Sequence, residues 1–131
     1  MLLCTLLRSY CPGLYGLGVC RSFVGDKILE EFLNDESNPQ ILNCGAGLCT
    51  RFERYRDLLE MSGAIYIELD IESSQKEKLR LIEAAGKDIR PLLDNVHFMT
   101  IDFTKNSIAD ILLPNKNPKS KFDPSRKTLV S

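Results

Sequence analysis

The stretch Gln40-Ile41-Leu42-Asn43-Cys44-Gly45-Ala46-Gly47 joins a short, mostly apolar run directly to a Gly-x-Gly turn. An apolar run of this length is typical of a parallel strand that is covered on both faces. Glycines in such a turn let the backbone approach a ligand closely, because no side chain blocks the way. The stretch therefore predicts a first strand, a tight turn and a following helix. A tight turn that meets no ligand is the alternative interpretation.

Apolar spacing on both sides of this stretch predicts the remaining elements. Helices are expected over residues 22–34, from about residue 48 to Gly63, from Ser74 to Gly86, and over 107–113. Strands are expected over residues 64–70 and 96–101, and a further strand begins at 128–130. Strands that alternate with helices indicate a parallel α/β sheet with right-handed crossovers.

Two of these helices carry finer signals. The apolar positions of the helix over 22–34 recur at helical spacing and predict one buried stripe, made of Val24, Ile28, Leu29, Phe32 and Leu33. Ser74 and Glu77 have the spacing of a capping box, which places a helix start at Ser74.

Composition excludes several classes of function. The 131 residues, 44% apolar and 27% charged, suit one globular domain. A net charge of -1 gives no general attraction to nucleic acid or membranes, and no apolar run is long enough to span a bilayer. The five cysteines form no Cys-x-x-Cys pair and His97 is the single histidine, so no metal site is expected. The lysine-rich segment 116–127 is interpreted as a solvated loop.

The N-terminus is apolar, but it lacks a basic region ahead of the apolar residues, and Arg8 interrupts them early. These features argue against a signal peptide and favour a segment that packs on the domain. Together with the unpaired cysteines, they predict a cytoplasmic protein.

Three polar or flexible features fall at the carboxyl ends of the expected strands, where ligands bind in parallel sheets. They are the Gly45–Gly47 turn, Asp70 and Asp102. Asp70 lies about 20 residues beyond the glycines, where a ribose-binding acid is expected; Glu68, on the same side of the strand, is the competing candidate. Thr50 stands where a dinucleotide site has its third glycine, which favours a nucleoside cofactor over NAD(P).

These residues carry a resemblance to a known family. Gly45-Ala46-Gly47-Leu48-Cys49-Thr50-Arg51-Phe52 resembles the Gly-Ala-Gly-x-Asp-Thr-Arg signature of the leucine carboxyl methyltransferase family. Gly18–Ser22, Tyr66–Asp70 and residues 122–129 are similar to further segments of that family, so the likeness spans about residues 14–130. Cys49 replaces the family's aspartate, which leaves Thr50 as the weaker cap of the following helix.

The resemblance implies a partial Rossmann-like fold that binds S-adenosylmethionine, with a parallel sheet truncated after the third full strand. Residues 1–17 are then an N-terminal apolar segment, 18–113 the cofactor-binding half of a methyltransferase domain, and 114–131 a polar loop with the start of a fourth strand. The implied cofactor contacts are Gly45, Ala46 and Gly47 to the methionine part, Arg21 to its carboxylate, Asp70 to the ribose, and Asp102 with Phe103 to the adenine. A surface arginine beside a helix start remains the alternative for Arg21.

The function implied is carboxyl- or O-methyl transfer to an unknown acceptor, either a small molecule or a protein carboxylate. His97 is expected to be packed or at a sheet edge, so no catalytic base is identified. The family's later strands, which begin with a Glu-Gly motif, are absent from the sequence. The sequence therefore leaves open an incomplete enzyme, a non-catalytic remnant and, less in keeping with the motif, an NAD(P)-binding domain. An exposed sheet edge also predicts self-association.

Overall fold

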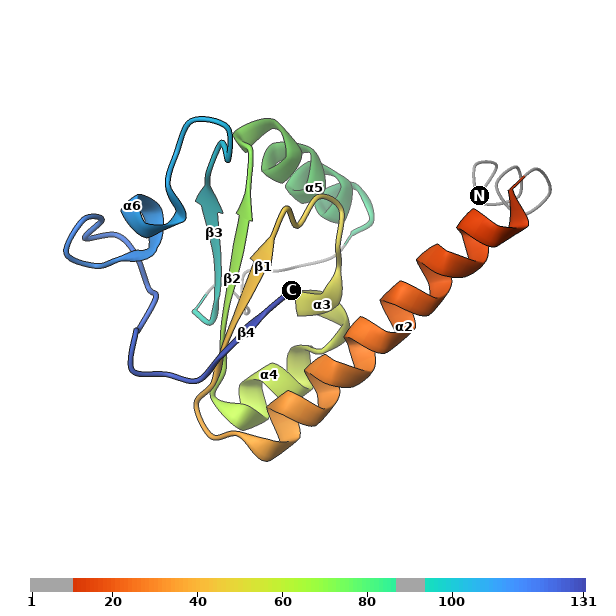
Figure 1. The fold of residues 1–131 in the computed structure, drawn as a ribbon, viewed down its shortest axis with the longest axis horizontal. Helices are drawn as coiled ribbons and strands as arrows, with labels where there is room; N and C mark the ends of the chain where they lie inside the picture. Colours follow the sequence, from red (N-terminus) through yellow and green to blue (C-terminus); the bar gives the residue numbers. More distant parts are fainter. Residues whose placement is uncertain (1–10, 87–93) are drawn as a thin grey trace.

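A computed structural model describes residues 11–86 and 94–131 of the chain. Four parallel strands form one sheet in the order β3-β2-β1-β4 (Figure 1). The strands are β1 (Gln40–Cys44), β2 (Ile65–Asp70), β3 (Val96–Thr100) and β4 (Thr128–Val130). The helices are α2 (Pro12–Asp35), α3 (Arg51–Arg54), α4 (Arg56–Ser62), α5 (Glu72–Ala84) and α6 (Ile108–Leu112). The predicted parallel α/β class is confirmed.

The strand register brings the carboxyl ends of the strands to one edge. Cys44, the last residue of β1, pairs with Leu69 of β2, and Asp70 pairs with Thr100 of β3. The glycine turn after β1, Asp70 at the end of β2 and Asp102 after β3 therefore lie at the same edge, as predicted. The three residues of β4 pair in parallel with Gln40, Ile41 and Leu42, which confirms the start of a fourth strand.

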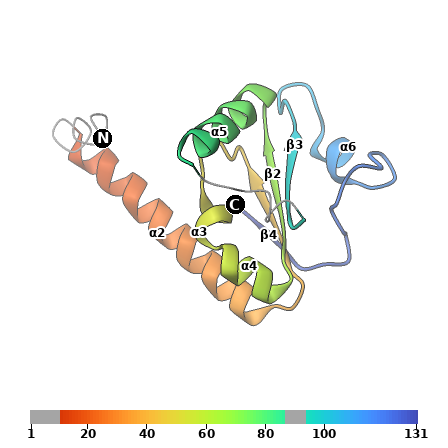
Figure 2. The same ribbon diagram turned by 180° about the vertical axis from the view of Figure 1, so that it is seen from behind.

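Two apolar clusters cover the two faces of the sheet. Helices α2, α3, α4 and α5 lie on one face and α6 on the other (Figures 1 and 2). Alternation along β2 separates the clusters, since Tyr66 belongs to the first and Ile67 to the second. The first contains Phe52 of α3 and Leu59 of α4, both almost fully buried. A strand covered on both faces is mostly apolar, and this is why β1 and β2 were recognisable in the sequence despite their few buried polar residues.

Helix α2 differs from the helix predicted over residues 22–34. It begins at Pro12, so the expected boundary between residues 17 and 18 falls inside it, and its N-terminal half extends beyond the sheet (Figure 1). Leu29 and Leu33 are buried, but Val24 and Ile28 are 53% and 47% exposed. The prediction of one buried stripe was therefore wrong at Val24 and Ile28. Val24 with Ile28 and Leu29 with Leu33 have the same i, i+4 spacing, but the helix packs against the core through Leu29 and Leu33.

The next two helices also differ in detail. The helix expected from about residue 48 to Gly63 is divided at Tyr55 into α3 and α4, and Gly63 ends α4 in the left-handed conformation. Thr50 precedes α3 but forms no side-chain capping bond, so its expected role as a cap was wrong.

The predicted capping box was wrong as well. Helix α5 begins at Glu72, which places Ser74 inside the helix, while the Glu77 carboxylate accepts hydrogen bonds from Arg80. Ile71 occupies the cap position, and its N–H donates to Asp70 Oδ1 instead of being capped by a downstream side chain.

The buried side chain of Gln40 holds the polar loop 114–127 to the sheet through hydrogen bonds. Gln40 Nε2 donates to the Asp123 carbonyl at 2.6 Å and to Thr128 Oγ1 at 2.8 Å, and Gln40 Oε1 accepts from the Asp123 N–H. These bonds place β4 beside β1. Beyond β4 the described sheet has no further strand, and the self-association expected of such an edge stays a prediction.

Within the described ranges, none of the helices combines the length and the apolar character that crossing a membrane requires.

Replacing Phe52 with alanine tests the core of the α2–α5 face. Phe52 is 0% exposed and packs edge-on against Phe98, with the two ring centroids 5.7 Å apart. We expect Phe52→Ala to lower the free energy of unfolding by about 3–5 kcal/mol, because it leaves a cavity. Phe23→Ala is the matched control: Phe23 is 63% exposed, and its loss is expected to cost less than about 0.5 kcal/mol. Urea denaturation measures both, and equal losses would contradict this description of the core.

Candidate functional site

The glycine turn closes directly over the end of β2. The N–H groups of Gly45 and Ala46 donate to the Leu69 carbonyl at 2.8 and 3.3 Å. Gly45 and Gly47 have φ values of +66° and +49°, a conformation that glycine adopts without strain. The turn is therefore built on backbone contacts to the neighbouring strand and presents little side-chain bulk of its own.

Asp70 holds this turn through its carboxylate. Asp70 Oδ2 accepts the Gly47 N–H at 2.6 Å, and Oδ1 accepts the Ile71 N–H at 2.7 Å. Asp70 thus lies on the same rim as the glycine turn, as the sequence pattern predicted. A carboxylate oxygen accepts more than one hydrogen bond, so both oxygens retain capacity for the hydroxyl groups of a ligand.

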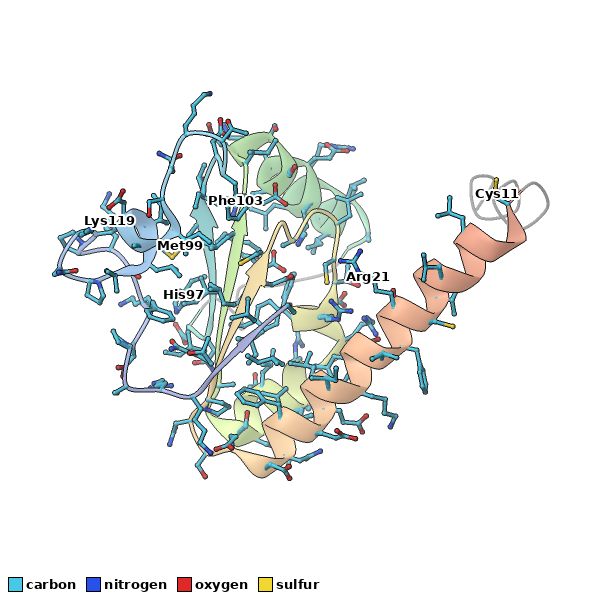
Figure 3. All side chains as sticks on the ribbon, viewed as in Figure 1. Cys11, Arg21, His97, Met99, Phe103 and Lys119 are labelled. Atoms are coloured by element: carbon cyan, nitrogen blue, oxygen red, sulfur yellow. The ribbon has the colours of Figure 1, made fainter. Side chains whose placement is uncertain are left out.

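Asp102 follows β3 at the same edge, which is joined to β2 by the bond from the Ile101 N–H to the Asp70 carbonyl at 2.9 Å. Its Oδ1 accepts from the hydroxyl and the N–H of Thr104 at 2.6 and 3.0 Å, and Oδ2 pairs with Lys105 at 2.9 Å. The Thr104 bonds, with help from Lys105, lower the pKa of Asp102 to about 2. Asp102 is therefore an ionised acceptor. Phe103 beside it is 45% exposed and lies near the carboxyl ends of β2 and β3 (Figure 3).

Arg21 lies apart from these residues, on the wall of a cavity of about 490 Å³ between α2 and the strands β1 and β4. Apolar side chains of both sides form most of the wall, among them Ile28, Leu29 and Leu129. Arg21 is exposed and makes no ion pair with the part of the chain that the structure describes; Figure 3 shows it on the side of α2 that faces the sheet. The residues that line this cavity do not include the glycine turn, Asp70, Asp102 or Phe103.

A second arginine of the cavity wall has a structural role. Arg51 Nε and Arg54 Nη1 each pair with the Asp26 carboxylate at 2.7 Å, which ties α3 to α2. The hydrogen bond from Arg54, together with that from Arg51, lowers the pKa of Asp26. Arg51 Nη1 also lies 3.8 Å from Cys49 Sγ. The charge of Arg51 is thus compensated, and the same side chain connects the cavity to the segment that follows the glycine turn.

A buried ion pair was missed by the sequence analysis. Lys78 Nζ lies 2.6 Å from Glu68 Oε2, with side-chain exposures of 2% and 0%. Burial raises the pKa of Glu68, and Lys78 opposes that rise. Glu68 was the competitor of Asp70 for a ligand, but here its Oε2 is paired with Lys78 inside the fold. Lys78 lies on the inward face of α5 with Gln75 and Ile82, but a charged residue at such a position is expected in solvent.

His97 and Cys44 are two further titratable side chains of the sheet. His97 is half-buried on β3, one of the two edge strands of the sheet, and burial lowers its pKa. Burial likewise raises the pKa of Cys44, which packs against the cluster on the α6 face. In residues 11–86 and 94–131, no group of three or more potential ligand side chains is placed to hold a metal ion.

A glycine turn and acids at the carboxyl edge of a parallel sheet are features that α/β proteins of the nucleoside-binding class use to hold their ligands. The sequence model of the leucine carboxyl methyltransferase family matches residues 8–131, and the chain belongs to that family.

Among solved structures, the chain is similar to a candidate sarcosine dimethylglycine methyltransferase from Galdieria sulphuraria, with 20% identity and a TM-score of 0.39. That similarity covers 66% of this chain, which spans only 29% of the length of the solved protein. Comparison with individual curated proteins gives no match.

Replacing Gly47 with alanine tests the turn. With φ at +49°, an alanine there is expected to cost roughly 1–2 kcal/mol of stability. Gly18→Ala is the matched control, because a Cβ at Gly18 in helix α2 meets nothing within 4 Å, and it is expected to gain roughly 0.5–1 kcal/mol. Chemical denaturation measures both. A Gly47→Ala protein as stable as Gly18→Ala would contradict the described turn.

The charge of Asp102 can be tested by NMR titration of its carboxyl carbon. Because the Thr104 hydroxyl is the main cause of its low pKa, Thr104→Ala is expected to move the pKa up toward the ordinary aspartate value. Thr104→Ser keeps a hydroxyl and is expected to keep the low pKa. A pKa unchanged in Thr104→Ala would show that another group holds the carboxylate.

Proposed function

We propose that this chain forms the S-adenosylmethionine-binding part of a methyltransferase that transfers a methyl group to a carboxylate or hydroxyl acceptor. The observation that carries the proposal is the hydrogen bond from Gly47 to Asp70, which joins a side-chain-free turn to a ribose-binding acid at one edge of the sheet. Membership of the leucine carboxyl methyltransferase family supports the same cofactor.

The proposed cofactor lies along the carboxyl edge. Asp70 accepts the ribose hydroxyls with the lone pairs that its two backbone bonds leave available. Asp102 accepts the adenine amino group, and the partly exposed ring of Phe103 offers an apolar surface to the base. Gly45, Ala46 and Gly47 approach the methionine part, where a larger side chain would collide.

Arg21 is proposed to bind the carboxylate of the cofactor. The cation is on a largely apolar wall without an acidic partner among the described residues, and a guanidinium is well suited to pair with a carboxylate through two hydrogen bonds. The neighbouring Arg51 is unsuitable for this role, because Asp26 already binds it. Proximity of the two regions is supported by the Arg51–Cys49 contact.

Methyl transfer requires the protein mainly to position the cofactor and the acceptor. The sulfonium group of the cofactor supplies the reactivity, and the chain holds it in place for an in-line displacement by the acceptor. A carboxylate acceptor is already a nucleophile and needs no general base. Since His97 is the single histidine and lies near the start of β3, away from the carboxyl edge of the sheet, we favour a carboxylate, from a small molecule or a protein.

A cytoplasmic location is proposed from the sequence, whose five cysteines form no Cys-x-x-Cys pair and do not suit a disulfide framework.

Calorimetric titration with S-adenosylhomocysteine tests the cofactor proposal. The protein is expected to bind it, and Asp70→Ala is expected to weaken binding about tenfold or more, the effect of losing one charge-assisted hydrogen bond worth roughly 1.5 kcal/mol. Asp110→Ala, an exposed acid of α6 on the opposite face of the sheet, is the control and should bind normally.

Two outcomes of this titration would count against the proposal. If the wild-type protein gave no binding heat at millimolar ligand, the chain would not hold the cofactor. If NADH bound more tightly than S-adenosylhomocysteine, the site would belong to a dinucleotide.

A further inference from the structure

The buried pair Glu68–Lys78 lies directly beneath the proposed ribose site. Side chains alternate along a strand, so Glu68 and Asp70 are on the same face of β2, the face covered by α2–α5. Lys78 reaches Glu68 from α5, the helix that begins immediately after Asp70. The pair therefore fixes the strand that ends in Asp70 to the helix that follows it.

Lys78 also contacts the segment on the other side of the glycine turn. Its Nζ lies 5.8 Å from the centre of the Phe52 ring in α3, the helix to which the turn leads. A small cavity of about 190 Å³ is lined by Lys78 together with Leu48 and Thr50 of that segment. The Asp70–Gly47 hydrogen bond joins the end of β2 to the glycine turn. Lys78 contacts both sides of this bond, through Glu68 in β2 and through Phe52 in α3.

Other polar groups near Lys78 form hydrogen bonds to the same strands. Gln75, one turn before Lys78 on α5, donates to the carbonyl of Met99 at 3.0 Å and accepts from Thr100 Oγ1 at 3.3 Å. Around the acid itself, Asn43 Nδ2 donates to the hydroxyl of the buried Tyr66 at 3.1 Å. The ends of β2 and β3, which carry Asp70 and Asp102, are thus held to α5 by polar contacts.

Stability alone does not account for the pair. Removing two charges from water costs more than a simple ion pair returns, and apolar residues of similar volume often replace such pairs without loss of stability. Here Glu68 Oε1 is buried without a well-formed hydrogen bond, which makes the pair a poor stabiliser. The pair is better explained by its effect on Asp70. Without the charge of Lys78, the carboxylate of Glu68 would repel the carboxylate of Asp70 on the same strand face.

We propose that Glu68 and Lys78 are positioning residues for Asp70. The ammonium of Lys78 neutralises the deeper acid and fixes the end of β2, so that Asp70 keeps its bond to Gly47 and its position at the rim for the ribose. This inference rests on the proposed function and adds a pair of residues that do not touch the cofactor.

The test replaces the whole pair by apolar residues of similar size. In Glu68→Leu/Lys78→Met no charge is left unpaired, so the fold is expected to persist. The exposed pair Lys27–Glu30 of α2, with nitrogen and oxygen 3.1 Å apart, gives the matched control Glu30→Leu/Lys27→Met. For both variants, unfolding, affinity for S-adenosylhomocysteine and amide exchange at Gly47 and Ile71 are measured.

We expect the buried-pair variant to unfold like the wild type but to bind about tenfold more weakly, with faster exchange at the two amides that Asp70 holds, because it loses the polar link that fixes the end of β2 to α5; the repulsion between Glu68 and Asp70 is tested separately by Lys78→Gln. The control should match the wild type in all three measurements. Binding and exchange unchanged in the buried-pair variant would overturn the inference while leaving the proposed function intact. A wild-type protein that does not bind the ligand would instead refute the proposed function.

Single replacements keep the test decisive if the double variant does not fold. Lys78→Arg retains the charge, whereas Lys78→Gln removes it and keeps a hydrogen-bond donor. Binding that is retained in Lys78→Arg and lost in Lys78→Gln supports the positioning role. Equal affinity in the two variants contradicts it.

Discussion

The hydrogen bond from the Gly47 N–H to Asp70 Oδ2 joins two features that lie 23 residues apart in the chain. It depends on the parallel register of β1 and β2, which sets Cys44 opposite Leu69 and so delivers the turn and the acid to the same edge. It depends equally on the positive φ of Gly47, which a larger residue would adopt only with strain. Because the turn has no side chains of its own to fix it, this bond and the backbone bonds to Leu69 determine the shape of the site.

Most of the charged side chains near this edge are paired with an opposite charge inside the fold, whereas Arg21 is not paired with any described residue. Asp26 binds Arg51 and Arg54 and fastens α2 to α3, while Lys78 neutralises Glu68 inside the core. Arg21 is left without an acid among the described residues. An arginine without an acidic partner is the one that can pair with the carboxylate of a ligand, because Asp26 already neutralises Arg51. The structural pairs thereby distinguish Arg21 from Arg51, although both are arginines on the wall of one cavity.

The sequence was informative wherever a local pattern had one solution. A short apolar run ending in glycines predicted β1 and its turn, and an apolar run ending in an acid predicted β2 and Asp70. It failed where several local solutions compete. On α2, the pairs Val24–Ile28 and Leu29–Leu33 have the same spacing, and only packing against the sheet selects the second. At the start of α5, Asp70 accepts the Ile71 N–H, so the helix begins before the capping box that the sequence offered.

Lys78 shows why some residues of the site escape any pattern. A lysine in a polar helix is expected in solvent, and only the three-dimensional partner, an acid in the middle of a buried strand, brings it inside. Glu68 and Asp70 are two acids on one face of one strand, and they could not both face a ligand without mutual repulsion. Burying one with an ammonium and leaving the other at the rim resolves that conflict. The depth of each acid in the strand therefore decides that Asp70 is the acid available to a ligand; alternation along the strand places Glu68 one step deeper, but the burial of Lys78 beside it comes only from the fold.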